Sequence, residues 1–171
     1  AWPGPAILVT TPVHIRACVL DNAPLPPLDF ILSSTAPLDG VLAARAEALY
    51  GACVQEFYGS TETGAIAARR QAQTQVWRNF EGIRVAPSGD GFRVETPYLQ
   101  EPMILSDQVE VLHDREFLLH GRNTEIVKIA GKRIALGDLN RQLLAIEGVV
   151  DATFFLPGGE DGDADGAVRA P

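Results

Sequence analysis

Residues 57–64 read Phe57-Tyr58-Gly59-Ser60-Thr61-Glu62-Thr63-Gly64. Glycine permits backbone conformations that other residues avoid and lets a ligand approach the main chain closely. Exposed amides in such a turn form a concavity that suits anions. Thr61 can donate a hydrogen bond to a phosphate oxygen, Glu62 offers the oxygen ligand that Mg²⁺ prefers, and Tyr58 presents a flat ring to a purine. The segment therefore predicts a loop that binds nucleotide phosphate, metal and base.

The same residues also fit a simpler structure. Ser, Thr and Gly cap and terminate helices for purely local reasons, and polar turns far outnumber nucleotide-binding loops. A polar turn between a strand and a helix stays open as the alternative until a second segment points to the same ligand.

Composition narrows the class of protein and its partners. The chain has 171 residues, enough to bury a sizeable core. Its formal net charge of −8 and pI of about 4.8 give no basic surface for nucleic acid, and no apolar run is long enough to span a bilayer. Cys18 and Cys53 form neither a Cys-x-x-Cys pair nor a disulfide framework, which fits a reducing compartment. We expect a cytoplasmic protein without nucleic-acid or membrane partners.

The first part of the chain predicts strands that alternate with helices. Short apolar runs and helical spacing predict strands over 6–10, 30–34 and 52–57 and helices over 13–20 and 40–50. Asp39 is the expected N-cap of the second helix and Gly51 its stop signal. The segment 57–64 would then follow the carboxyl end of a strand, where α/β proteins commonly bind ligands.

The remainder predicts mostly strands. Short β-like runs between turn signals recur from Trp77 to His120 and predict a small twisted sheet or distorted barrel. Two further short runs flank Ala130-Gly131-Lys132 and predict another hairpin. Asp138 is the expected cap of a helix that ends near Ile146, and residues 149–156 predict a last strand.

Four landmarks in order resemble motifs of the adenylate-forming (ANL) superfamily, which includes acyl-CoA synthetases, luciferases and the adenylation domains of peptide synthetases. Thr35-Ala36-Pro37 stands where many members have Gly-Ala-Pro, and Tyr58-Gly59-Ser60-Thr61-Glu62 resembles Tyr-Gly-x-Thr-Glu. Leu105-Ser106-Asp107 stands where the family has Thr-Gly-Asp, with Ser106 replacing the glycine. Gly121-Arg122, followed by Lys128, Gly131 and Arg133-Ile134, resembles the hinge region.

The resemblance covers about residues 6–156 and implies a fold. The expected class is α/β (α+β): the C-terminal part of a large AMP-binding domain, with a strand-helix-strand unit and a small barrel-like sheet, and then the start of a small mobile domain. The implied divisions are 1–76 for the α/β part, 77–121 for the β-rich subdomain, 122–124 for the hinge and 125–171 for the small domain.

The resemblance also assigns residues to the nucleotide. Adenine would lie beside Tyr58 and the loop Thr35-Ala36-Pro37, with Gly59 and Ser60 in the same binding segment. Thr61 would contact the α-phosphate and Glu62 would bind the metal.

The later motifs carry the remaining implied roles. Asp107 would accept hydrogen bonds from the ribose hydroxyls, as an acceptor-only carboxylate can. Arg122 would hold the ribose or phosphate with its planar fork. Thr124 occupies the hinge position, and Lys128 and Gly131 would lie on a hairpin that faces the thioester-forming site. Thr61, Glu62 and Lys128 are the residues with an implied catalytic role.

The implied activity is that of an AMP-forming acid–thiol ligase. ATP with Mg²⁺ would convert a small carboxylic acid to an acyl-adenylate, because the carboxylate itself has no good leaving group. The thiol of CoA, or of the phosphopantetheine on an acyl carrier protein, would then displace AMP. Rotation of the small domain would let one nucleotide site serve both steps.

Two parts of the family pattern are absent from the 171 residues. There is no Ser/Thr/Gly-rich phosphate loop, and Lys128 and Lys132, the only lysines, both fall in the hinge hairpin. We therefore expect a partial chain that does not adenylate an acid by itself. A non-catalytic adenylate-binding or carrier-docking module is the alternative. Asp161-Gly162-Asp163-Ala164-Asp165-Gly166 also matches half of a calcium loop, although a solvated acidic loop fits it better.

Overall fold

The structure is a computed structural model that describes residues 4–89, 91–122, 126–129, 132–144, 146, 148–149 and 152–155. Its helices are α1 (Pro12–Leu20), α2 (Gly40–Tyr50) and α3 (Leu136–Leu144). Its strands are β1 (Ile7–Thr10), β2 (Phe30–Ser33), β3 (Cys53–Ser60), β4 (Gly64–Arg69), β5 (Trp77–Asn79), β6 (Arg84–Ser88), β7 (Gly91–Glu95), β8 (Met103–Leu105), β9 (Asp107–His113), β10 (Glu116–Arg122), β11 (Ile126–Ile129) and β12 (Lys132–Ala135). The predicted α/β class is confirmed.

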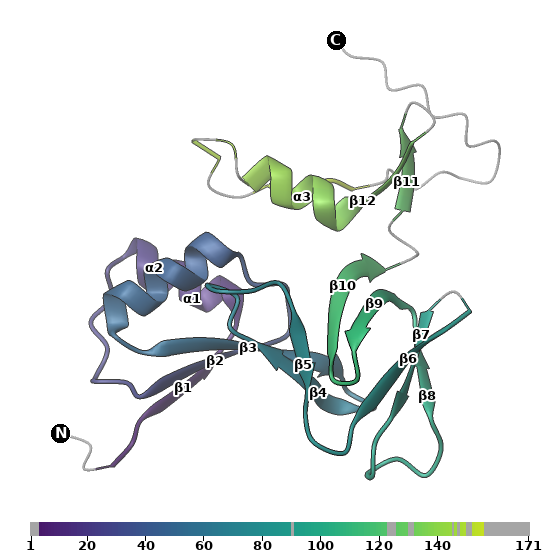
Figure 1. The fold of residues 1–171 in the computed structure, drawn as a ribbon. Helices are drawn as coiled ribbons and strands as arrows, with labels where there is room; N and C mark the ends of the chain where they lie inside the picture. Colours follow the sequence, from purple (N-terminus) through teal and green to yellow (C-terminus); the bar gives the residue numbers. More distant parts are fainter. Residues whose placement is uncertain are drawn as a thin grey trace.

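A mixed seven-stranded sheet runs through most of the molecule in the order β1-β2-β3-β4-β5-β10-β9. The first three strands are parallel, and each later neighbour pairs antiparallel. Both α1 and α2 cover one face of the parallel strands (Figure 1). Their core contains Ile15, Ile31, Leu42, Ala46 and Val54, all buried. The sheet changes from parallel to antiparallel pairing after β3, directly at the segment 57–64.

Local sequence signals explain both helices of this part. Thr11 caps α1, where its hydroxyl accepts a hydrogen bond from the His14 amide, and Pro12 occupies the first turn, where its missing N–H costs nothing. Asp39 caps α2 and accepts a hydrogen bond of 2.9 Å from the Leu42 amide. Gly51 ends α2 with a left-handed φ of 66°. The predicted cap and stop signal of the second helix are confirmed.

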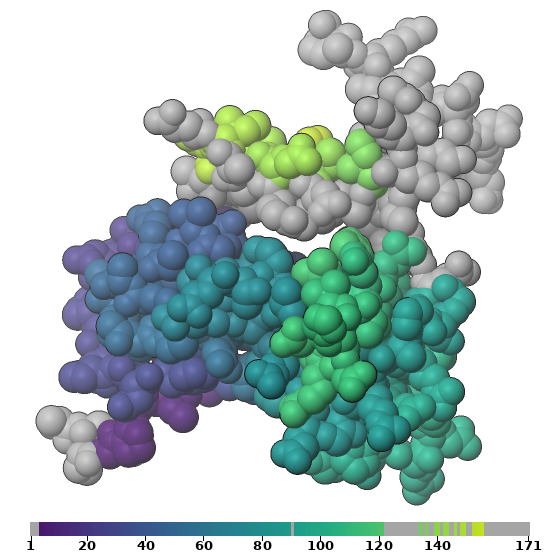
Figure 2. Space-filling view, in the orientation of Figure 1, coloured from purple at the N-terminus to yellow at the C-terminus, as the bar shows by residue number. Residues whose placement is uncertain are grey.

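The antiparallel part has a second core, which is largely aromatic. Trp77, Phe92 and Phe117 are fully buried there together with Ile66 and Val94. The three-stranded sheet β6-β7-β8 packs against β9 and the rest of this core. In the space-filling view the α/β part and the antiparallel part meet side by side (Figure 2). The predicted small sheet is confirmed, but β9 and β10 belong to the large sheet instead.

The last described elements are the hairpin of β11 and β12, which was predicted, and the helix α3. Two expectations are wrong here. Asp138 lies inside the first turn of α3 and does not precede it, because the helix already begins at Leu136. Residues 152–155 are not a strand. None of the helices among the described residues is long and apolar enough to cross a membrane.

Candidate functional site

Residues 57–64 form the end of an antiparallel hairpin. β3 continues to Ser60, residues 61–63 turn, and β4 begins at Gly64 with a φ of 65°. The Ser60 amide donates to Thr63 Oγ1 at 3.0 Å, and the Thr63 amide donates to Ser60 Oγ at 3.2 Å. These reciprocal bonds close the turn with its own side chains. The alternative of a turn from a strand into a helix is therefore wrong.

Gly59 is required by the hairpin itself. A Cβ at this position would lie 1.9 Å from the carbonyl oxygen of Gly64, which no side chain can occupy. The strand pairing shifts between Tyr58 and Gly59, where Tyr58 pairs with Ala67 and Gly59 with Ala65, so the extra residue of a bulge, Ile66, lies on β4. The sequence predicted that a ligand approaches the backbone closely at Gly59. In the structure the partner strand β4 makes this close approach.

Tyr58 contributes its ring to the aromatic core and its hydroxyl to the site. The ring centroid lies 5.4 Å from that of Trp77 and 6.1 Å from that of Phe117. Its hydroxyl donates a hydrogen bond of 2.9 Å to Asp107 Oδ2. The ring is therefore held by protein neighbours, and only part of it is open to an adenine. The bond links the hairpin directly to the Asp107 motif.

The backbone of Asp107 also lies beside the hinge motif that contains Arg122. Asp107 is the first residue of β9 and pairs with Arg122, the last residue of β10. Gly121 precedes this pair with a φ of 101°, at a shift in the strand register. The structure therefore brings Tyr58, Asp107 and the backbone of Arg122 together. The side chain of Arg122 lies outside the described residues.

Thr61 and Glu62 occupy the tip of the turn, and both are exposed. A hydrogen bond from Ser60 is the main reason that the pKa of Glu62 lies below its ordinary value. Glu62 is thus an ionised, accessible carboxylate. No group of three His, Cys, Asp or Glu side chains in the described residues could hold a metal alone. A single carboxylate still fits Mg²⁺ that takes its other ligands from phosphate and water.

The loop Thr35-Ala36-Pro37 follows β2, which is the parallel neighbour of β3. All three residues are exposed, and Thr35 has a φ of 80°. A positive φ is strained for a β-branched residue, and this strain explains why glycine suits the first position of this loop. Both candidate segments leave the carboxyl ends of adjacent strands, where α/β folds commonly form ligand sites.

The sequence analysis missed an ion pair whose carboxylate contacts the residue that follows the loop Thr35-Ala36-Pro37. Arg69 Nε donates to Glu56 Oε2 at 2.7 Å, and the Leu38 amide donates to Glu56 Oε1 at 2.7 Å. The Arg69 guanidinium also stacks 4.2 Å from the Trp77 ring centroid. Burial raises the pKa of Glu56, and Arg69 partly offsets this effect. The sequence held one signal for this pair. Glu56 lies two residues after Val54 on β3, so strand alternation places this glutamate on the buried face.

Several predicted residues cannot be placed in the site. Thr124 and Gly131 lie outside the described residues, as does the calcium-like stretch 161–166. Lys128 is described only by its backbone, which pairs with Arg133 in the β11–β12 hairpin. The roles of these residues remain predictions.

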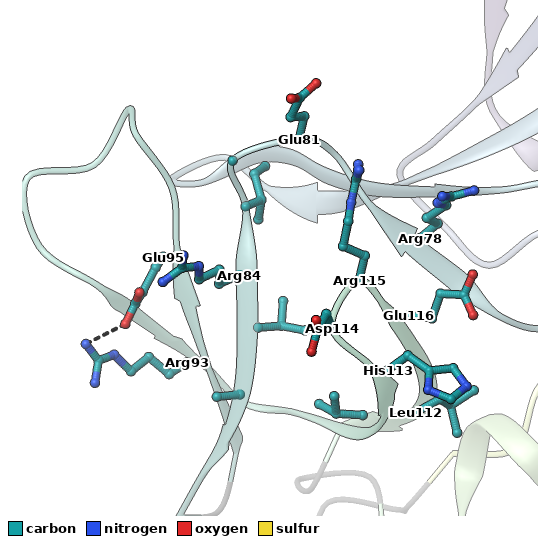
Figure 3. Close-up of a pocket in the computed structure, with 15 residues that line it drawn as sticks. Arg78, Glu81, Arg84, Arg93, Glu95, Leu112, His113, Asp114, Arg115 and Glu116 are labelled. Atoms are coloured by element: carbon teal, nitrogen blue, oxygen red, sulfur yellow. Dashed lines mark ion pairs between the residues drawn. The ribbon is translucent and has the colours of Figure 1, made fainter.

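The described residues also form a hollow away from this hairpin. A pocket of about 1430 Å³ is lined by residues from β5, β6, β7 and the turn between β9 and β10 (Figure 3). It contains none of the predicted site residues and lies at the opposite end of the β9–β10 hairpin from Asp107. Its charges are mixed, and Arg93 already pairs with Glu95 at 2.6 Å. We therefore place the candidate site at the hairpin and not in this pocket.

Comparison with protein-family models finds no match, and comparison with curated proteins finds none either. Solved structures do match, and they define a class: the chain has the fold of AMP-binding synthetase domains. A variant of E. coli MenE with bound OSB-AMS is similar with a TM-score of 0.72 and 15% identity, over 85% of this chain and 36% of that one.

Two other solved structures agree. The anthranilate CoA ligase AuaEII, in complex with anthranoyl-AMP, has a TM-score of 0.67 and 15% identity over 86% of this chain and 35% of its own. An AMP-forming acyl-CoA synthetase-like protein from Dyadobacter fermentans has a TM-score of 0.59 and 19% identity over 81% and 42%. The chain thus spans about two fifths or less of these proteins. At such identities the likeness establishes the fold, and it confirms the resemblance at that level.

Proposed function

We propose that this chain is part of an AMP-forming acid–thiol ligase. In the complete enzyme, a carboxylic acid would react with ATP to give an acyl-adenylate and pyrophosphate. A thiol, either of CoA or of a carrier protein's phosphopantetheine, would then take the acyl group and release AMP. MenE and AuaEII, which share the fold, were solved with OSB-AMS and anthranoyl-AMP, and this supports an adenylate as the ligand.

One observation carries the proposal: the 2.9 Å hydrogen bond between Tyr58 and Asp107. It joins two motifs that the sequence analysis assigned to the same nucleotide from widely separated positions. A carboxylate has about four acceptor sites, so Asp107 can accept hydrogen bonds from the ribose as well as from Tyr58. The fold alone does not require a carboxylate at the start of β9.

The remaining roles follow from exposure and chemistry. Thr61 is exposed and can donate its hydroxyl to the α-phosphate. Glu62 would provide one ligand to the Mg²⁺ that accompanies ATP, and the ion would offset charge on the triphosphate when bound. The loop Thr35-Ala36-Pro37 would border adenine with Tyr58, while Arg122 would hold the ribose or phosphate.

The second half-reaction is assigned to the end of the chain. We propose Thr124 as the hinge about which the β11–β12 hairpin changes position, and Lys128 and Gly131 as hairpin residues that face the thiol. These assignments rest on the sequence motif and on the confirmed hairpin.

The direct test is a titration of the 171-residue chain with AMP, followed by ¹⁵N chemical shifts. We expect saturable shifts at Tyr58, Thr61 and Asp107, and a loss of affinity of at least about tenfold in Asp107→Ala, since hydrogen bonds to charged groups contribute roughly 1.5–3 kcal/mol. Glu110→Gln is the matched control, because Glu110 lies on the same strand, is exposed and pairs with His120. Absence of AMP binding by the folded chain contradicts the proposal.

A non-catalytic adenylate-binding or carrier-docking module is the second candidate. It accounts for the nucleotide-binding motifs without requiring a phosphate loop or a further lysine. Both candidates expect AMP binding, and neither expects acid-dependent pyrophosphate release from this chain alone. They differ in the surrounding coding sequence: the enzyme requires a phosphate loop before this region and a catalytic lysine after it. Pyrophosphate exchange with a panel of acids, by a polypeptide that includes those parts, separates the two.

A further inference from the structure

We propose that Glu56 is a positioning residue that fixes the loop Thr35-Ala36-Pro37 at the adenine side of the nucleotide site, with Arg69 as the cation that holds it in place. This inference rests on the proposed function for its ligand. Its structural half, the control of the loop by one buried carboxylate, can be tested without any ligand.

The contacts of Glu56 connect three separate segments. One carboxylate oxygen accepts the Leu38 amide, which directly follows the loop, at 2.7 Å. The other oxygen accepts Arg69 Nε from β4, also at 2.7 Å. Glu56 itself lies on β3, four residues before the turn at Ser60. A single side chain therefore ties the loop after β2 to the two strands that carry the hairpin.

Arg69 is fixed by further contacts, so it can hold the carboxylate in one orientation. Its guanidinium lies over the Trp77 ring, and its Nη1 donates to the Gln75 carbonyl at 3.3 Å. The Glu56 and Arg69 side chains are 3% and 9% exposed. The pair is therefore screened little by solvent.

Stability alone gives a weak reason for such a pair. Taking a carboxylate out of water is costly, and well-packed apolar residues of similar volume often serve as well or better. The Leu38 contact gives a specific reason. It fixes the end of a loop whose first residue, Thr35, is held at a strained positive φ, and strained conformations persist only where the surroundings enforce them.

The test compares two ligands in the 171-residue chain. AMP carries adenine, whereas ribose 5-phosphate keeps the ribose and phosphate but lacks the base. In Glu56→Gln the side-chain amide must face either Arg69 or the Leu38 N–H, so one of the two contacts is lost. We expect hydrogen exchange of the Leu38 amide to accelerate by about tenfold or more, as for loss of a charge-assisted hydrogen bond. AMP affinity should fall by a similar factor, and ribose 5-phosphate affinity should change by less than about twofold.

Val54→Ala is the matched control. Val54 lies on the same strand, two residues earlier and fully buried, and its apolar side chain can form no hydrogen bond to the loop. The truncation should lower the melting temperature without changing the ratio of the two affinities. A merely structural role of Glu56 predicts the same behaviour in both variants.

Arg69→Lys provides a second variant in case Glu56→Gln does not fold. It keeps the positive charge and removes the planar fork, so we expect an AMP-selective loss and faster Leu38 exchange, both smaller than in Glu56→Gln. Unchanged Leu38 exchange in the folded variants overturns the inference, and so does an equal loss of both ligands. If the unsubstituted chain binds neither ligand, the proposed function fails instead, and Leu38 exchange still decides whether Glu56 controls the loop.

Discussion

The hydroxyl of Tyr58 donates to Asp107 Oδ2 at 2.9 Å, although 49 positions separate the two residues in the chain. Tyr58 lies in β3, the last parallel strand, and Asp107 begins β9 at the far edge of the same sheet. The bond therefore links two strands that β4, β5 and β10 separate in the sheet, and the Tyr58 ring that carries the hydroxyl packs against the aromatic core. A site built on this contact is supported by the largest buried side chains of the antiparallel part.

Removal of the Tyr58 hydroxyl should separate its two roles. In Tyr58→Phe we expect the free energy of unfolding to fall by about 1.5–3 kcal/mol, the usual contribution of a hydrogen bond to a charged group, because the ring contacts with Trp77 and Phe117 remain. Chemical denaturation measures this loss. A decrease above about 3 kcal/mol would show that the ring packing, and not only the hydrogen bond, depends on the hydroxyl.

Glycine at the start of the adenine loop should stabilise the chain. Thr35 has a φ of 80°, and strain of this kind costs about 1–3 kcal/mol. In Thr35→Gly the loss of strain exceeds the added entropy of the unfolded glycine, so we expect a gain of about 1 kcal/mol in thermal denaturation. Ala36→Gly is the control. Ala36 has no positive φ, and the same change there should destabilise.

The two glycines of the hairpin should differ in their tolerance of alanine. Gly59→Ala places a Cβ on the Gly64 carbonyl, so we expect a loss of at least about 2 kcal/mol, in the range of severe packing errors. Gly64→Ala meets no atom but keeps a left-handed backbone, which costs about 1–2 kcal/mol. Urea denaturation of both variants gives the order. The reverse order would show that the close approach of Gly59 to Gly64 relaxes freely.

Acid should weaken the contact between α2 and the strands through Glu47. Hydrogen bonds from Arg70, at 2.8 and 2.9 Å, are the main reason that the pKa of Glu47 lies below its ordinary 4.5. Its contribution is therefore present above pH 4.5 and is lost as the pH falls through the folded-state pKa. With Arg70 partly exposed, we expect no more than about 1 kcal/mol.

Stability curves between pH 7 and pH 3 check this expectation. Glu47→Gln should be less stable than the unsubstituted chain at pH 7 and should lose less stability on acidification. Glu101→Gln, at an exposed loop position, should leave the curve nearly unchanged. Parallel curves for the chain and Glu47→Gln would show that the Arg70 contact does not stabilise the fold.

The exposed carboxylate of Glu62 should affect metal-dependent binding only. Glu62→Gln should leave the melting temperature and AMP affinity without metal nearly unchanged. Affinity for ATP in the presence of Mg²⁺ should fall by at least about tenfold. Loss of a group that only supports a metal ligand already costs about this factor, and Glu62 would be a ligand itself. Calorimetry with and without Mg²⁺ measures both quantities. Equal affinities with Mg²⁺ for the two proteins would remove Glu62 from the metal site.

The sequence predicted the first five elements because each boundary has a local chemical signal. Asp39 and Gly51 delimit α2 through a hydrogen bond and a left-handed backbone, and neither depends on distant residues. The strand β4 was not predicted. Its sequence Gly64-Ala65-Ile66-Ala67-Ala68-Arg69 is rich in alanine, which favours helices in isolation, and only pairing with β3 makes it a strand.

The same limit applies to the site. The motifs identified Tyr58 and Asp107 separately, but the hydrogen bond between them depends on the order of strands in the sheet. Glu56 and Arg69 become neighbours only because β3 and β4 pair in antiparallel register. Gly59 was correctly singled out, but the reason given for it was wrong. A glycine that allows close approach to the backbone looks the same in the sequence whether a ligand or a neighbouring strand makes that approach.

The first strand has a practical consequence for handling the protein. Within the described residues β1 pairs only with β2, and Ile7 and Val9 are 60% and 68% exposed on it. An open edge with apolar side chains recruits strands from other molecules. Concentrated samples should therefore form soluble aggregates, and a lysine in place of Val9 should keep them dispersed enough for spectroscopy.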